Sequence, residues 1–268
     1  MVMQPQPSKP PSSLKGEVVV RQYRPQDHDQ VFALLRVGFA VGPGSPGETA
    51  VRRALWTPAA FACYALILAS TALSIFGQTQ AVLALCLELL ALGVLVHLRR
   101  GAAQAFEDFC TRAAEDDLRD IPAYYQQPVP GSRAGFWVAV IGEEVVGYFG
   151  MEHLPSRPTI GHLRRLIVSP YHRRKGIASN IIDAIVAHAQ AQPTLSDNLK
   201  LGCPYAAPLT TLELETSALQ PPAIALYERH GFRVVGSRQM PLARAGLNNV
   251  TVWKMQRPVY GGLHAKTA

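Results

Sequence analysis

The sequence predicts an α/β (α+β) fold in which a central mixed sheet is interrupted by an inserted apolar helical hairpin. Stretches with strand periodicity alternate with stretches of helical periodicity, as in a sheet covered by helices. In addition, residues 57–98 contain no Lys or Arg and one acidic residue, Glu88. At 268 residues the chain can bury a full core, which excludes a disordered polypeptide. The expected organisation is a disordered tail at 1–16, a domain at 17–256 containing the hairpin at 57–98, and a C-terminal tail at 257–268.

The start of the domain predicts a strand and a helix. Residues Glu17–Arg21 alternate weakly, as in a first strand. Pro25 and Asp27 then favour a helix start, and apolar residues follow at helical spacing: Val31, Leu34, Leu35, Gly38 and Phe39. Residues 42–47 consist of Gly, Pro and Ser, which predicts a loop before the hairpin.

The apolar stretch predicts a membrane hairpin. Residues Pro58–Phe76 carry no charge and are long enough to cross a hydrocarbon core of about 30 Å, and Ala81–His97 form a second run. Arginine pairs at 52–53 and 99–100 flank the two runs, so both flanks are expected on the cytosolic side. The alternative is a buried helix pair in a soluble core. Glu88 keeps this alternative open, because a carboxylate at mid-depth costs about 2.5–3.5 kcal/mol. A shallow re-entrant hairpin, or pairing in a homodimer, would lower that cost.

The second half of the chain predicts most of the sheet. Residues 99–120 have the pattern of a surface helix that leaves the membrane. Two later helices are expected, Ile177–Gln190 and Pro221–Arg229. Six segments are predicted as strands: Ala134–Val140, Val145–Met151, Leu163–Val168, Thr211–Glu215, Phe232–Gly236 and Val250–Met255.

The net charge of +7 is concentrated in the second half of the chain. Residues 121–268 carry 15 basic and 8 acidic side chains. A pI near 9.4 is compatible with nucleic-acid binding, but no helix-turn-helix, zinc or RNP-like pattern accompanies it. The four cysteines show neither a disulfide framework nor metal-type spacing, so no metal is expected. Anionic small molecules explain the basic excess better.

A basic loop between a predicted strand and a predicted helix is the most informative segment. The strand ends at Pro170, and the loop then places backbone N–H groups and a helix N-terminus at one point. The ligand expected at this point is an anion, with a pyrophosphate as the first candidate. A solvated helix start or a nucleic-acid patch would give the same pattern. The residues expected at this site are Leu166, Ile167, Val168, Arg173, Arg174, Lys175, Gly176, Ile177 and Ala178.

Two motifs resemble the GNAT acetyltransferase superfamily. The family's acetyl-CoA signature, Q/R-x-x-G-x-G/A, is met by Arg173-x-x-Gly176-x-Ala178. About fifty residues later, Tyr227 lies on a predicted helix that ends before Gly231-Phe232, as in that family. The hairpin insert, together with further segments, resembles the membrane-anchored branch that acetylates cysteine S-conjugates or aspartate. These segments are Asp120-Ile121, Tyr124-Tyr125, Phe136–Ala139, Leu163–Leu166 and Glu215–Gln220.

The resemblance implies a GNAT fold and direct acetyl transfer from acetyl-CoA to an amine. The CoA diphosphate would bind the N–H groups of Arg174 to Ala178, and the pantetheine arm would follow Leu166–Val168. The Val168 N–H would stabilise the oxyanion. Tyr227 would protonate the leaving thiolate, although a purely structural, buried tyrosine is the alternative.

Neither the general base nor the acceptor is determined by the sequence. Glu152 and His162 are candidate bases, but a surface role is favoured for each. Arg164 and Arg165 are neighbours in a strand and should point to opposite faces, so one of them could hold a substrate carboxylate while the other is solvated or ion-paired. The expected acceptor is a small amino acid or its conjugate, at the cytosolic face of the endoplasmic reticulum membrane. Alternatives are a protein-lysine acetyltransferase and a catalytically inactive CoA-binding scaffold.

Overall fold

A seven-stranded mixed sheet forms the centre of the molecule. The computed structural model describes residues 17–127, 129–191, 203–242 and 247–260, so the tail predicted at 1–16 lies outside the described residues. Of the C-terminal tail predicted at 257–268, residues 257 and 258 belong to strand β7, and residues 261–268 lie outside the described part. The strand order is β1-β2-β3-β4-β5-β7-β6, and only β4 and β5 run parallel. The mixed sheet predicted from the sequence is thus confirmed. The strands are β1 Val19–Gln22, β2 Gly135–Ile141, β3 Glu144–His153, β4 Ile160–Val168, β5 Thr211–Ser217, β6 Arg233–Leu242 and β7 Leu247–Pro258.

Helices cover both faces of the sheet. On β2, Phe136 and Val138 face one core cluster with the N-terminal helices, while Trp137 and Ala139 face the other cluster with α6 and α8. This alternation is expected for a strand buried on both sides. The helices of the first layer are α1 His28–Leu35, the π-helix η2 Arg36–Val41, α2 Pro46–Ala54, α4 Gln78–Glu115 and α5 Ile121–Tyr125. Those of the second layer are α6 Ile177–Gln190 and α8 Pro221–Arg229, with the bounds that the sequence predicted.

The loop predicted at 42–47 is shorter than its composition suggested. Helix α2 begins at Pro46, and the hydroxyl of Ser45 accepts a hydrogen bond from the Glu48 N–H at 3.1 Å. Proline fits the first turn of a helix, where its missing N–H is not needed, and serine is a preferred N-cap. The Pro and Ser residues therefore start a helix where the sequence predicted a loop.

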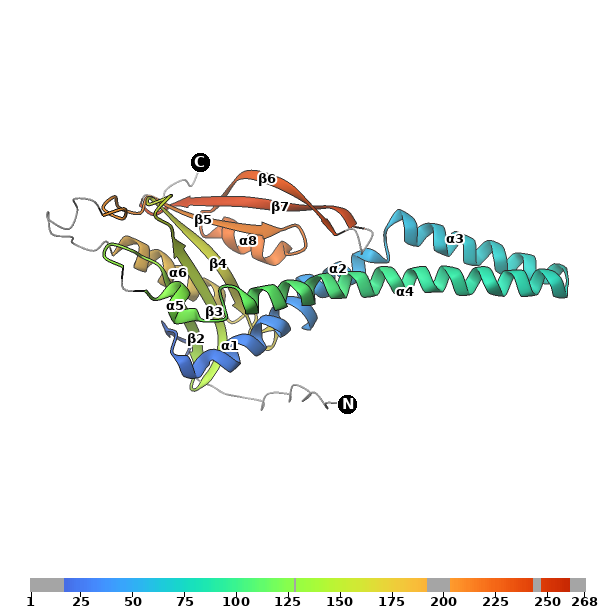
Figure 1. Cartoon of the computed structure of the whole chain (residues 1–268), viewed down its shortest axis with the longest axis horizontal. Helices are drawn as coiled ribbons and strands as arrows, with labels where there is room; N and C mark the ends of the chain where they lie inside the picture. The colour runs from blue at the N-terminus through green and yellow to red at the C-terminus, as the bar shows by residue number, and fades with distance from the viewer. Residues whose placement is uncertain (1–16, 128, 192–202, 243–246, 261–268) are drawn as a thin grey trace.

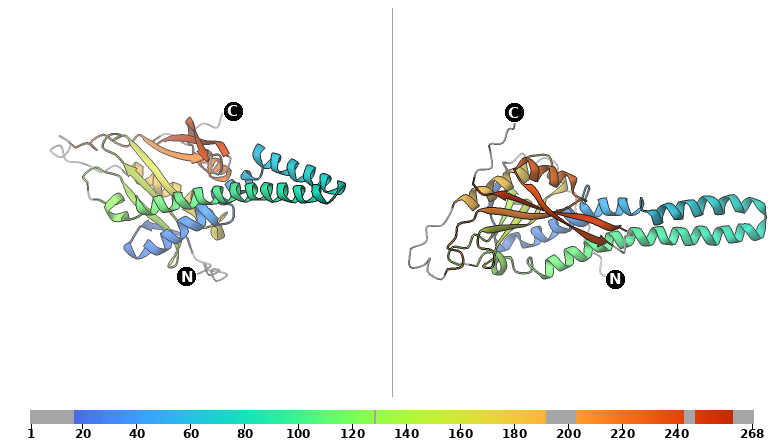
Figure 2. Two further views of the ribbon diagram at one scale, coloured as in Figure 1. Left: turned by 45° about the vertical axis from the view of Figure 1, so that its right-hand side comes forward. Right: turned by 90° about the horizontal axis from the view of Figure 1, so that it is seen from above.

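Helices α3 and α4 project from the domain as an antiparallel hairpin (Figures 1 and 2). Helix α3 spans Pro58–Leu73, and a 3-10 turn at Ser74–Phe76 leads into α4. Helix α4 continues without a break to Glu115, so the second apolar run and the surface helix predicted at 99–120 are one element. Among the described residues, α4 is the one helix long and apolar enough to cross a membrane by itself, and α3 with the helices before it qualifies as a bent pair.

Glu88 is satisfied within the hairpin. Its carboxylate accepts hydrogen bonds from Thr71 Oγ1 at 2.8 Å and from Ser70 Oγ at 3.3 Å, both on α3. Large apolar side chains around it are exposed, including Leu68, Leu83 and Leu90. The hairpin itself thus supplies hydrogen-bond partners for this carboxylate, and no second copy of the chain is needed for that purpose.

Strands β4 and β5 separate halfway along β4. Parallel pairing runs from Ile160 to Leu163, opposite Thr211 to Leu214, and then stops. Residues Arg164–Val168 keep β3 as their neighbour on one edge only. The separation leaves the other edge of β4 open in the middle of the domain.

Candidate active site

Two cavities meet at the open edge of β4. The larger, of about 590 Å³, lies against the basic loop and the start of α6. The smaller, of about 410 Å³, lies between β4, β5 and the inner end of α4. Both cavities are bordered by the same five residues: Phe39, Leu166, Ile167, Gln220 and Tyr227. A two-substrate reaction needs this geometry, because each cavity can hold one reactant while both face a common wall.

The larger cavity collects most of the residues predicted for CoA. Its lining includes Leu166–Val168, Arg173, Arg174 and Gly176–Ala178, whereas Lys175 is exposed and does not line it. Arg174 and Gly176 adopt φ angles of 64° and 78°, so two of three consecutive residues in this loop have a left-handed backbone conformation. A Cβ on Gly176 would meet open space, so the positive φ is what requires glycine here. Such a turn directs successive N–H groups at one point, where the N-terminus of α6 adds its partial positive charge.

The sequence predicts that Arg173 contacts CoA, whereas in the structure its side chain holds two backbone carbonyl groups. Its guanidinium donates to the carbonyls of Pro43 at 2.7 Å and of Gly38 at 3.4 Å. Burial lowers the pKa of Arg173 while the charge of Glu48 raises it, with a net decrease. The side chain thus ties the segment between η2 and α2 to the basic loop, so that both sides of the larger cavity are fixed together.

The Val168 N–H points toward the open edge. The next residue, Ser169, donates its N–H to the Val146 carbonyl on β3 at 2.8 Å, and Val168 lies opposite Gly147. Successive N–H groups of a strand point to opposite edges, so the Val168 N–H is directed away from β3. It therefore faces the gap left by β5, as an oxyanion donor would have to.

Tyr227 stands between the two cavities. It is 8% exposed, its ring packs edge-on against Phe232 at 5.8 Å, and burial raises the pKa of its hydroxyl. Within the described residues, no side chain or carbonyl forms a hydrogen bond with this hydroxyl. The group remains protonated and is available to a ligand at the junction.

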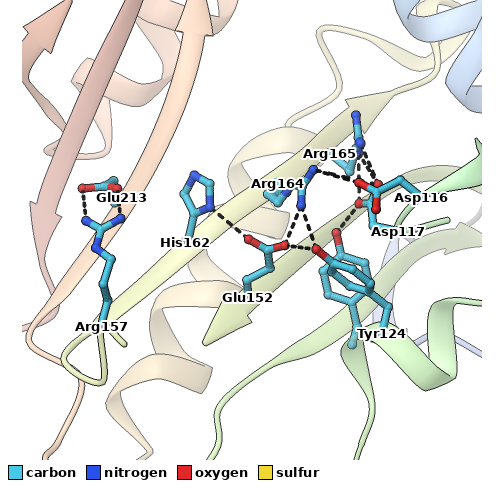
Figure 3. Close-up of polar contacts among 10 residues, drawn as sticks. Asp116, Asp117, Tyr124, Glu152, Arg157, His162, Arg164, Arg165 and Glu213 are labelled. Atoms are coloured by element: carbon cyan, nitrogen blue, oxygen red, sulfur yellow. Dashed lines mark hydrogen bonds and ion pairs between the residues drawn. The ribbon is translucent and has the colours of Figure 1, made fainter. Parts of the chain in front are cut away.

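Glu152 is a buried carboxylate at the centre of a partly buried polar cluster, two members of which, His162 and Arg164, line the smaller cavity (Figure 3). It accepts hydrogen bonds from Tyr124 and Arg164, each at 2.5 Å, and from His162 Nδ1 at 3.1 Å. Burial alone would raise the pKa of this carboxyl, but these three donors outweigh burial and lower it to about 2. The sequence left a surface role open for Glu152, whereas the structure buries it at 8% exposure.

Arg164 and Arg165 do not point to opposite faces. Both guanidinium groups approach Asp117, Arg165 at 2.6 Å and Arg164 at 4.0 Å, and both border the smaller cavity (Figure 3). The strand alternation fails because the register of β3 and β4 shifts here and Arg165 adopts a φ of 62°. The prediction of opposite faces was therefore wrong, for a reason that a local irregularity of the backbone explains.

Several residues of the site were not predicted from the sequence. Asp117 is fully buried after the end of α4 and binds Arg165 and the hydroxyl of Tyr125. Tyr124 and Tyr125 were noted only as part of a resemblance, yet each donates to a buried carboxylate. Two adjacent acids at the end of a helix were the visible signal, but nothing local pairs them with arginines about 48 residues later in the chain.

The match to a known domain family indicates an acetyltransferase. The Acetyltransferase (GNAT) domain family matches residues 132–234, which include β2 to α8. A crystal structure of a GNAT-family acetyltransferase from Staphylococcus aureus Mu50 overlaps with a TM-score of 0.46 at 13% identity, over 91% of this chain and 99% of that chain. The domain-family match, and not this structural likeness, indicates the class of enzyme.

Proteins of similar sequence indicate which acetyltransferases this chain resembles. Probable N-acetyltransferase family 8 member 5 of Mus musculus is 29% identical over 222 residues, covering 81% of this chain and 84% of the relative. N-acetylaspartate synthetase of Danio rerio is 25% identical over 230 residues, covering 84% and 70%. N-acetyltransferase 8F1 of Rattus norvegicus is 28% identical, covering 82% and 87%. The chain is thus an N-acetyltransferase with a GNAT domain, similar to the N-acetyltransferase 8 and N-acetylaspartate synthetase group. GNAT acetyltransferases use acetyl-CoA and an amine.

Proposed function

We propose that the chain transfers the acetyl group of acetyl-CoA directly to the amino group of a small amino acid or amino-acid conjugate. The observation that carries this proposal is the pair of cavities that share Leu166, Ile167 and Tyr227. No cysteine is found among the described residues that line either cavity, so a covalent acetyl-cysteine intermediate has no nucleophile there. In this proposal both reactants bind together, and the amine attacks the thioester without an intermediate on the enzyme.

The chemical step uses groups at the junction of the cavities. The amine nitrogen bonds to the thioester carbon, and the carbonyl oxygen becomes an oxyanion that accepts a hydrogen bond from the Val168 N–H. The C–S bond then breaks, and the sulfur of CoA accepts a proton from Tyr227. The N–H groups of Arg174 to Ala178 hold the CoA diphosphate, with Lys175 adding positive charge at the outside of the loop.

His162 is our candidate for the general base. Its Nδ1 donates to Glu152, which leaves Nε2 as the proton acceptor, and the ring borders the smaller cavity. Glu152 is engaged by three donors and orients the imidazole. His162 accepts the proton of the substrate ammonium, directly or through water. His162→Gln should therefore lower kcat, and Glu152→Gln should lower it less, because the imidazole is retained and loses only the partner that orients it. A wild-type kcat in His162→Gln would exclude this role.

Arg164 is our candidate for binding an acceptor carboxylate. Its side chain is 25% exposed, and its Nη2 faces Asp116, a solvent-exposed side chain, at 3.8 Å. A substrate carboxylate can replace Asp116 without breaking the buried contact to Glu152. Arg165, at 9% exposure, is committed to Asp117 and matches the ion-paired alternative for this pair. A relative named N-acetylaspartate synthetase supports an amino-acid acceptor.

The hairpin is proposed as the membrane anchor, with the catalytic part on the cytosolic face of the endoplasmic reticulum. Exposed apolar side chains on α3 and α4, and arginines at 52–53 and 99–100 that flank them, support this orientation. Protease added to sealed microsomes should digest the catalytic part. Protection of that part would contradict the orientation.

The proposed activity is tested by release of free CoA thiol from membranes containing the protein. Four acceptors suffice: aspartate, an S-substituted cysteine, a polyamine and a lysine peptide. We expect turnover with one or both of the amino acids. Turnover with the lysine peptide alone would indicate a protein acetyltransferase. No turnover with any acceptor, while acetyl-CoA binds, would indicate an inactive scaffold.

A further inference from the structure

Arg165 combines a strained backbone with a fully engaged side chain. Its φ of 62° lies in the left-handed region that side-chain-bearing residues rarely adopt. The register shift between β3 and β4 places Arg165 and Leu166 together opposite a single residue of β3, Phe149, which defines a β-bulge. A bulge at this position needs an interaction that holds it, because strain of this kind persists only where the surroundings impose it.

Asp117 supplies that interaction. Its carboxylate is fully buried and receives Arg165 Nη2 at 2.6 Å and Nε at 3.0 Å, the bidentate geometry that fixes a guanidinium in orientation as well as position. The hydroxyl of Tyr125 donates to the same carboxylate. The guanidinium also lies 5.1 Å from the centroid of the Phe109 ring, which stacks on Phe39.

The bulge decides which way the reactive edge of β4 faces. Arg165 directly precedes Leu166–Val168, and one residue more or less in a strand exchanges the directions of all the groups that follow. If the bulge relaxed, the Val168 N–H would turn toward β3 and away from the junction of the cavities. The ion pair at Asp117 and the position of the oxyanion donor are therefore mechanically linked.

We propose that Asp117 is a positioning residue, which pins Arg165 in the β4 bulge and so keeps the Val168 N–H directed at the junction of the two cavities. This inference rests on the proposed acetyl transfer. Asp117 borders neither cavity and touches no substrate; its two shortest guanidinium contacts are to Arg165, while Arg164 lies at a longer 4.0 Å. Because Asp117 lies two residues after the end of α4, the end of the hairpin helix also takes part in shaping the reactive strand.

The test compares two isosteric variants, Asp117→Asn and Asp27→Asn. Asp27 is the matched control, since it is equally buried and binds Arg21 in a bidentate pair at 2.7 and 2.8 Å, but it borders neither cavity. Both variants should lose stability. Misplacement of a reacting group by about 1 Å can lower the reaction rate about 100-fold, so we expect kcat of Asp117→Asn to fall by that factor. Its Kd for acetyl-CoA should stay within about threefold of the wild-type value. Asp27→Asn should keep its kcat.

Hydrogen exchange of β4 residues 164–169 gives a readout that needs no acceptor. Relative to exchange of the other central strands, which corrects for a general loss of stability, exchange here should become about tenfold faster in Asp117→Asn than in wild type, and this ratio should stay unchanged in Asp27→Asn. If Asp117→Asn does not fold, Arg165→Lys replaces it, because lysine keeps the charge and loses the bidentate geometry. Equal kcat, or equal β4 exchange, in the Asp117 (or Arg165) and Asp27 variants would overturn the inference. Absence of turnover by the wild-type protein would contradict the proposed function alone, since the exchange comparison still decides the positioning role.

Discussion

The two halves of α4 have opposite surroundings although they form one helix. In the outer half, up to Leu98, large side chains such as Leu83 and Leu90 are exposed and buried positions are mostly small, as at Ala84 and Ala91. In the inner half, Phe106 and Cys110 are buried against the domain, and Phe109 borders the smaller cavity, which is the proposed acceptor cavity. Figure 1 shows the helix running from the tip of the projection to the sheet.

In the proposed arrangement, the membrane anchor and one wall of the smaller cavity are therefore parts of the same continuous helix. A continuous helix transmits the position of its outer half to its inner half, at about 1.5 Å per residue. The acceptor cavity therefore has a defined distance from the membrane in the proposed arrangement. Changes in the outer half should therefore affect membrane retention only, and changes at the inner end should affect turnover only.

The largest expected effect concerns Tyr227. Tyr227→Phe removes the hydroxyl at the junction of the cavities and should lower kcat by about 100-fold or more, because general acid catalysis contributes about 10²–10⁴. Acetyl-CoA affinity, measured by calorimetry, and membrane retention should stay unchanged. Equal kcat in the two proteins would leave Tyr227 with a structural role only.

A charge in the outer half should release the protein from membranes. Leu83→Asp places a carboxylate on the exposed apolar surface, which costs about 3 kcal/mol and shifts partitioning by about 100-fold. Leu83→Ala is the control and should remain membrane-bound. Sedimentation of vesicles measures the bound fraction, and turnover of a soluble acceptor should be retained. Loss of turnover without release would contradict the separation of the two halves.

Arg164 is expected to affect acceptor binding. Arg164→Gln should raise KM about tenfold for a carboxylate acceptor, since a hydrogen bond to a charged group contributes about 1.5–3 kcal/mol. The KM for the corresponding amine without a carboxylate should not change. Arg238→Gln serves as the control, because Arg238 borders the same cavity and its exposed pair with Glu215 contributes little. A similar KM increase in both variants would reject a specific carboxylate contact.

The smallest expected effect is a change in how the free energy of unfolding depends on pH. Because the pKa of Glu152 is lowered from 4.5 to about 2 in the folded protein, its contribution is present above pH 4.5 and is lost as the pH falls toward 2. Wild type should exceed Glu152→Gln by about 1–2 kcal/mol in free energy of unfolding at pH 7, and the difference should shrink below pH 4.5. Denaturant titrations at pH 3 and pH 7 measure it. A constant difference would show that the hydrogen bonds do not depend on the charge.

Local patterns predicted the regular elements well. Helix α6 has the predicted bounds because its apolar spacing starts directly after Gly176, and α8 because Pro221 and Gly231 mark its ends. The continuity of α4 was missed because Arg99 and Arg100 change the composition without interrupting the helix. Charged residues beside an apolar run show where a helix leaves an apolar environment, but they do not show where the helix ends.

The side-chain contacts of the site could not be predicted from local sequence patterns, because they join residues that are separated in the sequence. The bulge at Arg165 is produced by the packing of β3 on β4 and by the buried carboxylate of Asp117. Likewise, Glu152 and His162 are ten residues apart in sequence but adjacent across the β3–β4 pair. Which residues carry charge was visible in the sequence, whereas the pairing of those charges required the three-dimensional structure.

The central claim is direct transfer between two reactants that occupy adjoining cavities. Initial rates of CoA release, measured over a grid of acetyl-CoA and acceptor concentrations, test it most directly. A ternary complex predicts double-reciprocal lines that intersect. Parallel lines, together with acetylated protein after incubation with acetyl-CoA alone, would show a covalent intermediate and contradict the account.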